Sequence, residues 1–244
     1  MSDDLPEHLR PFLLETIEPQ RERSAHVDLY LPDAIAPSPA IVFIHGGPIP
    51  AQARPTPRDW PAYTGYGRIA ASHGAVGVTV DHRLHGLEDY PRAAADVAAA
   101  VEVARADPRV DAQRVALWFF SGGGLLAARW LADPPAWLRC AAATYPLLAP
   151  LPNWPSVDPR FRPATAVAAA GRLPIVVTRP ELERPAVAAT VDEFLAAAGA
   201  SGADVEVIDI LGAHHGFETI DHTEPARQAV RGAFESVLAH LRAG

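Results

Sequence analysis

The chain alternates between short segments with the hydrophobic pattern of β-strands and longer segments with the pattern of helices. Residues 26–32 alternate between apolar and polar side chains, as in a half-exposed strand. Residues 40–47 and 75–84 are continuous apolar runs, which are typical of strands covered on both faces. Four further strands are predicted at residues 114–120, 140–148, 174–180 and 204–211.

Three helices are predicted between or after these strands, because apolar side chains recur there at helical spacing. The second begins after Pro185 and ends near Gly199, in line with the preference for proline at helix starts and glycine at helix ends. Strands and helices in turn indicate a mostly parallel sheet with helices on both faces, and such sheets carry their sites at the carboxyl ends of the strands. The apolar positions are Val97, Val101 and Ala104; Val187, Val191, Phe194 and Ala198; and Val230, Phe234, Val237 and Leu241.

One region departs from this alternation. Residues 150–173 are rich in proline and carry Trp154 and Phe161. The chain of 244 residues contains no repeat and no low-complexity linker, so we expect a single domain over residues 1–244. Within it, we interpret residues 150–173 as a short cap insertion that lies over the functional site.

Composition narrows the classes of partner. The formal net charge of −8 argues against nucleic acid and anionic membranes, since both require a basic surface. The sequence shows neither an apolar stretch of about 18 residues nor a secretory signal, so we expect a cytoplasmic protein. The single cysteine, Cys140, excludes an internal disulfide, and no histidines have convincing metal spacing. We therefore expect neither a metal nor another cofactor, while a homodimer stays open.

The stretch ALWFFSGGGLLAARW, residues 116–130, places a single serine where an apolar strand passes into a helix-like segment. A sharp turn at this point would lift Ser121 off the sheet and direct the N–H groups at the helix start toward its target. Gly122, Gly123 and Gly124 allow such a turn because they carry no side chain. Taken alone, the stretch also fits a glycine-rich phosphate loop or an ordinary strand–helix turn.

Two other strand ends carry candidate chemistry. FIHGGP, residues 43–48, follows an early strand, and GAHHGFE, residues 212–218, follows the last one. Histidine is the side chain whose pKa lies near working pH, so it is the expected base for a serine. A third group must orient this base, and RPELERP, residues 179–185 at the end of the strand at 174–180, offers Glu181 and Glu183.

These three strand ends together resemble the α/β-hydrolase superfamily, in particular its esterase and dienelactone-hydrolase-like branches. The resemblance implies that Ser121 is the nucleophile and that His215, followed by glycine and phenylalanine, is the base in preference to His214. Glu183 directly precedes a predicted helix start and is preferred to Glu181 as the acid. The chain order serine, acid, histidine is the order of this superfamily.

The resemblance also implies an α/β-hydrolase fold with a short insertion after the sixth strand, and an oxyanion hole formed by the N–H groups of Gly47 and Gly122. Phe119 stands two residues before the serine, where the superfamily motif has glycine. We expect Trp154 and Phe120 to contribute to substrate binding.

The expected activity is that of a serine hydrolase, which cleaves a small-molecule carboxylic ester or lactone through an acyl-enzyme on Ser121. An acyltransferase or cyclase of specialised metabolism would use the same triad if the insertion excluded water. A third reading is a non-catalytic hydrolase fold that binds a ligand, for which Phe119 and the glutamate in place of aspartate are the only support.

Overall fold

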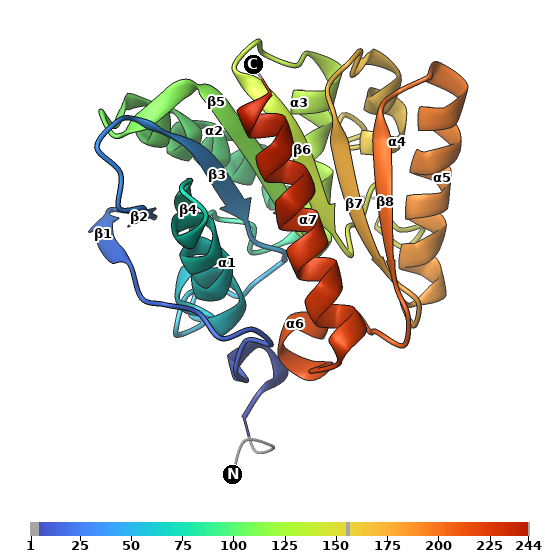
Figure 1. Ribbon diagram of the computed structural model, residues 1–244. Helices are drawn as coiled ribbons and strands as arrows, with labels where there is room; N and C mark the ends of the chain where they lie inside the picture. The colour runs from blue at the N-terminus through green and yellow to red at the C-terminus, as the bar shows by residue number, and fades with distance from the viewer. Residues whose placement is uncertain (1–4, 155–156, 244) are drawn as a thin grey trace.

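The computed structural model describes residues 5–154 and 157–243, and their core is an eight-stranded sheet with helices on both faces (Figure 1). The strand order is β1-β2-β4-β3-β5-β6-β7-β8. The pairs β1–β2 and β2–β4 are antiparallel, and every other pair is parallel. The strands are β1 Gln20–Ser24, β2 Val27–Leu31, β3 Ser38–Ile44, β4 Val76–Val80, β5 Val110–Phe120, β6 Leu138–Thr144, β7 Ile175–Pro180 and β8 Val205–Ile210.

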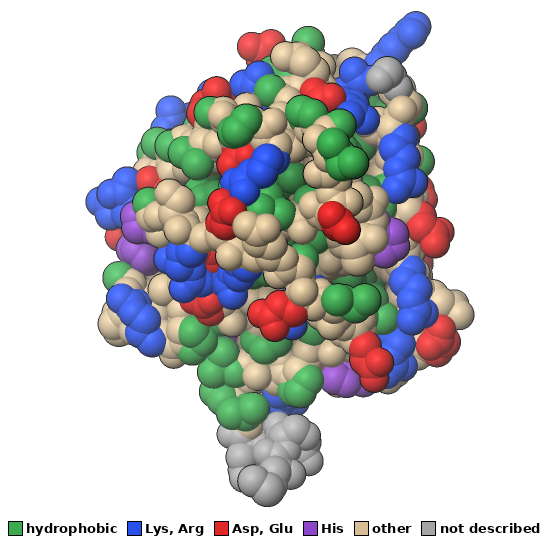
Figure 2. Space-filling model, turned by 60° about the vertical axis from the view of Figure 1, so that its left-hand side comes forward, with side chains coloured by type: hydrophobic (Ala, Val, Ile, Leu, Met, Phe, Trp, Pro, Cys, Tyr) green, Lys and Arg blue, Asp and Glu red, His purple; other side chains and the backbone are tan. Residues whose placement is uncertain are grey.

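The predicted mostly parallel sheet is confirmed, and all seven predicted strands are present. Strand β1 was missed because its sequence, QRERS, is entirely polar. It is held at the sheet edge by Asp28, a fully buried residue on β2 that pairs with Arg21 and Arg23 of β1 and with Arg58. Figure 2 shows arginine and acidic side chains close together on the face it presents.

Helices cover the two faces of the sheet in two groups (Figure 1). Helices α1 and α7 pack with one apolar cluster, and α2, α3 and α5 pack with the other. The predicted helices correspond to α2, α5 and α7, whereas α1 was missed because two glycines weaken its helical pattern. The helices are α1 Pro61–Ser72, α2 Tyr90–Ala106, α3 Ala128–Ala132, α4 Pro163–Ala166, α5 Pro185–Ser201, α6 Phe217–Ile220 and α7 Glu224–Arg242, with 3₁₀-helices at Glu7–Leu9, Pro57–Asp59, Leu87–Asp89, Ser121–Ala127 and Val167–Ala169.

The insertion after the sixth strand joins one helical layer. Its helix α4 and the 3₁₀-helix Val167–Ala169 pack against α3 and α5. The ring of Phe161 lies 5.4 Å from that of Tyr90 on α2, measured between centroids. The described part of the insertion therefore extends the layer of α2, α3 and α5. Residues 155–156 lie outside the described residues.

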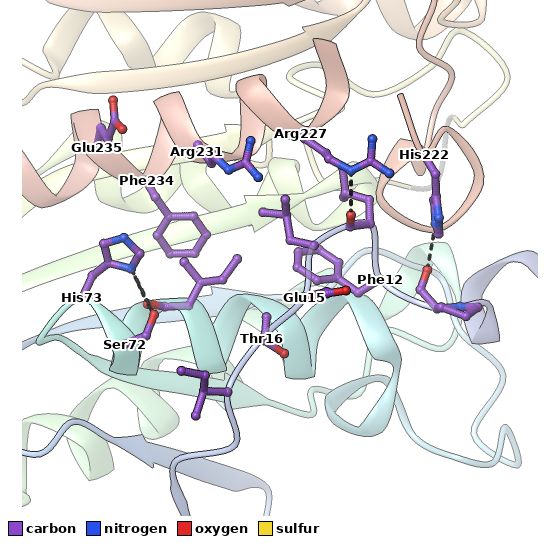
Figure 3. A pocket seen from close by; sticks show the side chains of 15 residues that line it. Phe12, Glu15, Thr16, Ser72, His73, His222, Arg227, Arg231, Phe234 and Glu235 are labelled. Carbon is purple, nitrogen blue, oxygen red and sulfur yellow. Dashed lines mark hydrogen bonds between the residues drawn. The ribbon is translucent and has the colours of Figure 1, made fainter. Parts of the chain in front are cut away.

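The N-terminal segment runs along the face covered by α1 and α7 and reaches the carboxyl edge of the sheet. Residues of this segment, α1 and α7 line a hollow of about 740 Å³. Figure 3 shows the side chains that line it. The His222 ring donates to the Pro11 carbonyl (3.0 Å), and Arg227 Nε donates to the Leu13 carbonyl (3.1 Å). The Leu13 N–H donates to the Glu218 carbonyl (2.8 Å). These bonds attach the segment to α6 and α7.

Candidate active site

Ser121 occupies a sharp turn between β5 and the 3₁₀-helix that follows it. Its φ of +50° lies in the left-handed region, which is unusual for a residue with a side chain and is found at strained functional turns. Gly122 is required at the next position, because a Cβ atom there would lie 2.0 Å from the Gly47 carbonyl oxygen. The turn presents the Ser121 side chain at the carboxyl edge of the sheet.

His215 lies in the turn between β8 and α6, beside Ser121. The distance between Ser121 Oγ and His215 Nε2 is 2.7 Å, and His215 Nδ1 makes a hydrogen bond with Glu183 Oε2. The neighbouring His214 is exposed, and its Nδ1 lies 3.2 Å from Asp221 Oδ1. The structure therefore brings His215, and not His214, to the serine.

Glu183 lies between β7 and α5, and its side chain is only 3% exposed. Its Oε1 accepts a hydrogen bond from the Arg184 N–H (2.7 Å), which leaves Oε2 for His215. Burial raises the pKa of the Glu183 carboxyl, but the bond to His215, its charge and the Arg184 N–H outweigh burial, so the net pKa is below the ordinary value. Glu181 lies elsewhere, with Oε2 accepting from the Gly212 N–H (2.7 Å).

The hydrogen-bonded residues Ser121, His215 and Glu183 can transfer a proton. In the tautomer with hydrogen on Nδ1, His215 donates to Glu183 and offers the Nε2 lone pair to the Ser121 hydroxyl. An ionised Glu183 then stabilises the imidazolium that forms when Ser121 loses its proton. Chemically, the arrangement suits a serine nucleophile with a positioned general base.

Two backbone N–H groups are available beside Ser121. The Gly122 N–H belongs to the first turn of a helix, where N–H groups have no partner within the helix. The Gly47 N–H makes no hydrogen bond with any residue that the structure describes. The Gly46 N–H donates to the Tyr63 hydroxyl (3.2 Å), and Pro48 has no N–H. Among the described residues, the Gly47 and Gly122 N–H groups therefore stay available beside Ser121.

His45, which precedes these glycines, holds the loop. Its ring stacks on that of His82 with centroids 3.6 Å apart, and His82 Nε2 donates to the His45 carbonyl (2.9 Å). Burial lowers the pKa of His45 well below its ordinary value and that of His82 to about 4. Both rings are neutral at pH 7 and serve to position the loop.

A cavity of about 250 Å³ opens on Ser121 and His215. Its walls are mainly aromatic and apolar, with two glutamates, and no arginine is among the lining residues that the structure describes. The N-terminal segment contributes to one side, where the His8 ring lies 4.3 Å from the Trp60 ring between centroids. The other lining residues are Glu7, Gly46, Gly47, Ile49, Ala62, Tyr63, Tyr145, Gly216, Glu218 and Thr219.

The two residues predicted to bind substrate do not line this cavity. Phe120 is fully buried, because strand alternation directs it toward α1 and α7, where its ring packs 4.9 Å from Tyr66 and 5.2 Å from Tyr63. Trp154 packs against the apolar cluster of α2, α3 and α5. The prediction for Phe120 and Trp154 is therefore corrected: one is behind the cavity wall, and the other is in a helical layer.

The aromatic walls of the cavity were missed. Tyr145 directly follows β6, has a φ of +36°, and its ring lies 4.5 Å from His215 between centroids. Its place at the carboxyl end of a strand was the signal that could have found it. Trp60 and Tyr63 lie at the start of α1, a helix that the sequence pattern did not predict.

Metal-ion sites and membrane-spanning helices are not found among the described residues. Within 5–154 and 157–243, no three His, Cys, Asp or Glu side chains are grouped so as to hold a metal ion. No helix in these ranges has the length and apolar character needed to cross a membrane. Cys140 is buried in the sheet, and burial raises the pKa of its thiol.

Known proteins share this fold. The family model BD-FAE matches residues 27–130. The esterase Est2 of the Planctomycetes species Thermogutta terrifontis is 20% identical, covers 87% of this chain and 86% of its own, and has a TM-score of 0.67. The thermostable carboxylesterase EstE1, cloned from a metagenomic library, is 20% identical over 94% and 92% of the two chains, with a TM-score of 0.71. No curated protein matches the sequence.

The sheet order, the carboxyl-edge site and these similarities define the chain's class. It has the α/β-hydrolase fold. On this fold, the hydrogen-bonded residues Ser121, Glu183 and His215 follow one another along the chain in the order serine, acid, histidine.

Proposed function

We propose that this protein is a serine hydrolase that cleaves a small carboxylic ester or lactone through an acyl-enzyme on Ser121. The observation that carries the proposal is the hydrogen-bonded row from Ser121 Oγ through His215 to the buried Glu183, which opens on a cavity. The similar solved structures support it, since they are described as esterases and one as phosphorylated by paraoxon.

The first half of the reaction forms the acyl-enzyme. Ser121 Oγ attacks the ester carbonyl carbon while its proton passes to His215 Nε2. The carbonyl electron pair moves to oxygen, and the Gly47 and Gly122 N–H groups donate to this oxyanion. When the carbonyl re-forms, the bond to the leaving alcohol breaks, and the alcohol takes the proton from His215.

The second half releases the acid. Water enters in place of the alcohol, gives a proton to His215 Nε2 and attacks the acyl carbon. A second oxyanion forms at the same N–H groups, and its collapse breaks the bond to Ser121 Oγ. His215 returns the proton to the serine, so the cycle consumes one water and yields one acid and one alcohol.

Hydrolysis is favoured over transfer to another acceptor. The transfer reading required the insertion to exclude water, but its described side chains lie in a helical layer and do not line the cavity. Product analysis separates the two reactions, because hydrolysis yields free acid and transfer yields a new ester, amide or ring. The intact row of Ser121, His215 and Glu183 argues against a non-catalytic fold.

The test is covalent labelling with a fluorophosphonate, measured by intact mass. We expect a single adduct on the wild type, no adduct on Ser121→Ala and much slower labelling of His215→Ala. A folded wild type that stays unlabelled and hydrolyses no short-chain 4-nitrophenyl ester would refute the proposal.

A further inference from the structure

The wall of the cavity contains a buried carboxyl group that takes no part in the Ser121–His215–Glu183 triad. Glu218, on α6, is 1% exposed and is one of the residues that line the cavity at Ser121. Its Oε1 accepts a hydrogen bond from the Tyr66 hydroxyl (3.1 Å). Its Oε2 is buried and has no hydrogen-bond partner in the part of the chain that the structure describes.

The surroundings of this carboxyl supply hydroxyl groups, and the described residues that line the cavity include no arginine or lysine. The Tyr145 hydroxyl, after β6, is a second neighbour of the Glu218 carboxyl. Tyr63, on α1, accepts a hydrogen bond from the Gly46 N–H, and its own proton has no acceptor among residues 5–154 and 157–243. The cavity therefore combines one unsatisfied acceptor with tyrosine hydroxyls that can donate.

An unpartnered carboxylate oxygen in a protein wall is costly. A buried polar atom without a hydrogen bond destabilises the fold by about 1–3 kcal/mol, and more when it is charged. Buried polar atoms without a partner are rare, and one explanation for such an atom is a ligand that supplies the missing hydrogen-bond donor. A substrate hydroxyl suits this position, since it can donate to a carboxylate and accept from a tyrosine at the same time.

We propose that Glu218, together with the hydroxyls of Tyr63 and Tyr145, forms a polar subsite that binds a hydroxyl group of the ester substrate. This inference rests on the proposed serine hydrolase function and specifies its substrate class as hydroxyl-bearing esters. The cavity of about 250 Å³ lies below the usual size of ligand pockets, which restricts that class to small molecules.

Two pairs of esters that differ only in a hydroxyl or a methyl group test the subsite. Methyl 3-hydroxypropanoate and methyl butanoate place the difference on the acyl side, and 2-hydroxyethyl acetate and propyl acetate place it on the alcohol side. Acid release in a pH-stat gives kcat/KM for all four. In one pair we expect the wild type to prefer the hydroxyl-bearing ester by about tenfold or more. The ester with a methyl group in place of that hydroxyl leaves Oε2 unpaired.

Variants assign the preference to Glu218. Glu218→Leu should bring the hydroxyl-to-methyl ratio to about one, and Glu218→Gln, which keeps an acceptor oxygen, should retain part of it. Tyr66→Phe is the matched control: it removes a hydrogen bond from the same carboxyl, but Tyr66 does not line the cavity. Its ratio should equal that of the wild type.

Fluorophosphonate labelling separates the two levels of the proposal. A labelled wild type with no hydroxyl preference in either pair, or a preference that Glu218→Leu retains, would overturn the subsite and leave the serine hydrolase standing. A wild type that is not labelled would refute both. If Glu218→Leu does not fold, Glu218→Gln and Tyr145→Phe decide, and an unchanged ratio in both would likewise overturn the subsite.

Discussion

Burial of Glu218 gives stability a pH dependence that can be measured without any substrate. Burial raises the pKa of this carboxyl from 4.5 to about 7, although its own backbone N–H and the hydroxyls of Tyr145 and Tyr66 lower it. Between these two values the folded state holds a proton that the unfolded state has lost. Stability therefore falls as the pH rises from about 4.5 to about 7, and the loss remains above that range.

The magnitude follows from the width of this interval. One pH unit corresponds to 1.36 kcal/mol, so an interval of about 2.5 units costs about 3 kcal/mol once Glu218 is ionised. Glu218→Gln has the same shape and cannot ionise. The free energy of unfolding of the variant, minus that of the wild type, should therefore rise by about 3 kcal/mol between pH 4.5 and pH 8.

The assay is urea unfolding of both proteins at several pH values across that range. The other acidic and histidine side chains of the cavity wall, Glu7, His8 and His215, are common to both proteins, so their contributions largely cancel in the difference. Glu15→Gln, at an exposed position, is the control and should give a flat difference. A flat difference for Glu218→Gln, or one that falls with pH, would refute the account of a desolvated carboxyl.

Three further predictions concern the triad, the oxyanion turn and the sheet edge. Glu183→Gln should lower kcat/KM about a thousandfold or more by disturbing the histidine tautomer, whereas Glu181→Gln should change it little; equal effects in steady-state assays would reject the assignment. Gly122→Ala should lower kcat at least a hundredfold, because the new Cβ would lie 2.0 Å from the Gly47 carbonyl oxygen and would push the Gly47 loop away. Near-normal turnover of this variant would contradict the proposed oxyanion geometry. Asp28→Asn should destabilise the protein by about 2 kcal/mol in urea unfolding, since it removes the buried charge that pairs with three arginines. An unchanged unfolding midpoint would show that only the backbone hydrogen bonds to β2 hold β1.

Local pattern was enough to predict most of the sheet and the strand ends that carry chemistry. Strands such as β3 and β4 are covered on both faces, so nearly all of their residues are apolar and the runs are visible in the sequence. Ser121 and His215 each follow such a run, and parallel strands bring their carboxyl ends to one edge. Their proximity follows from the strand order, and in the structure Ser121 Oγ lies 2.7 Å from His215 Nε2.

Residues whose role depends on packing between distant segments could not be assigned in this way. Glu181 and Glu183 follow the same strand, and only the path of the turn decides that Glu183 contacts His215 while Glu181 binds Gly212. Phe120 adjoins the serine in sequence, yet strand alternation places it behind the cavity wall.

By itself, the sequence determined the α/β alternation and the strand ends, because these depend on short-range periodicity. The candidate serine and histidine came from the resemblance of the motifs at those strand ends to the α/β-hydrolase superfamily. The tertiary structure alone decided the edge strand β1, whose polar residues pair with Asp28, and the cavity walls, and it placed Glu183, the preferred acid, against His215. Tyr63, Tyr145 and Glu218 come from α1, the end of β6 and α6, and meet only when those elements pack. No local sequence pattern predicts that these three residues lie together, since this depends on the arrangement of the whole sheet and its helices.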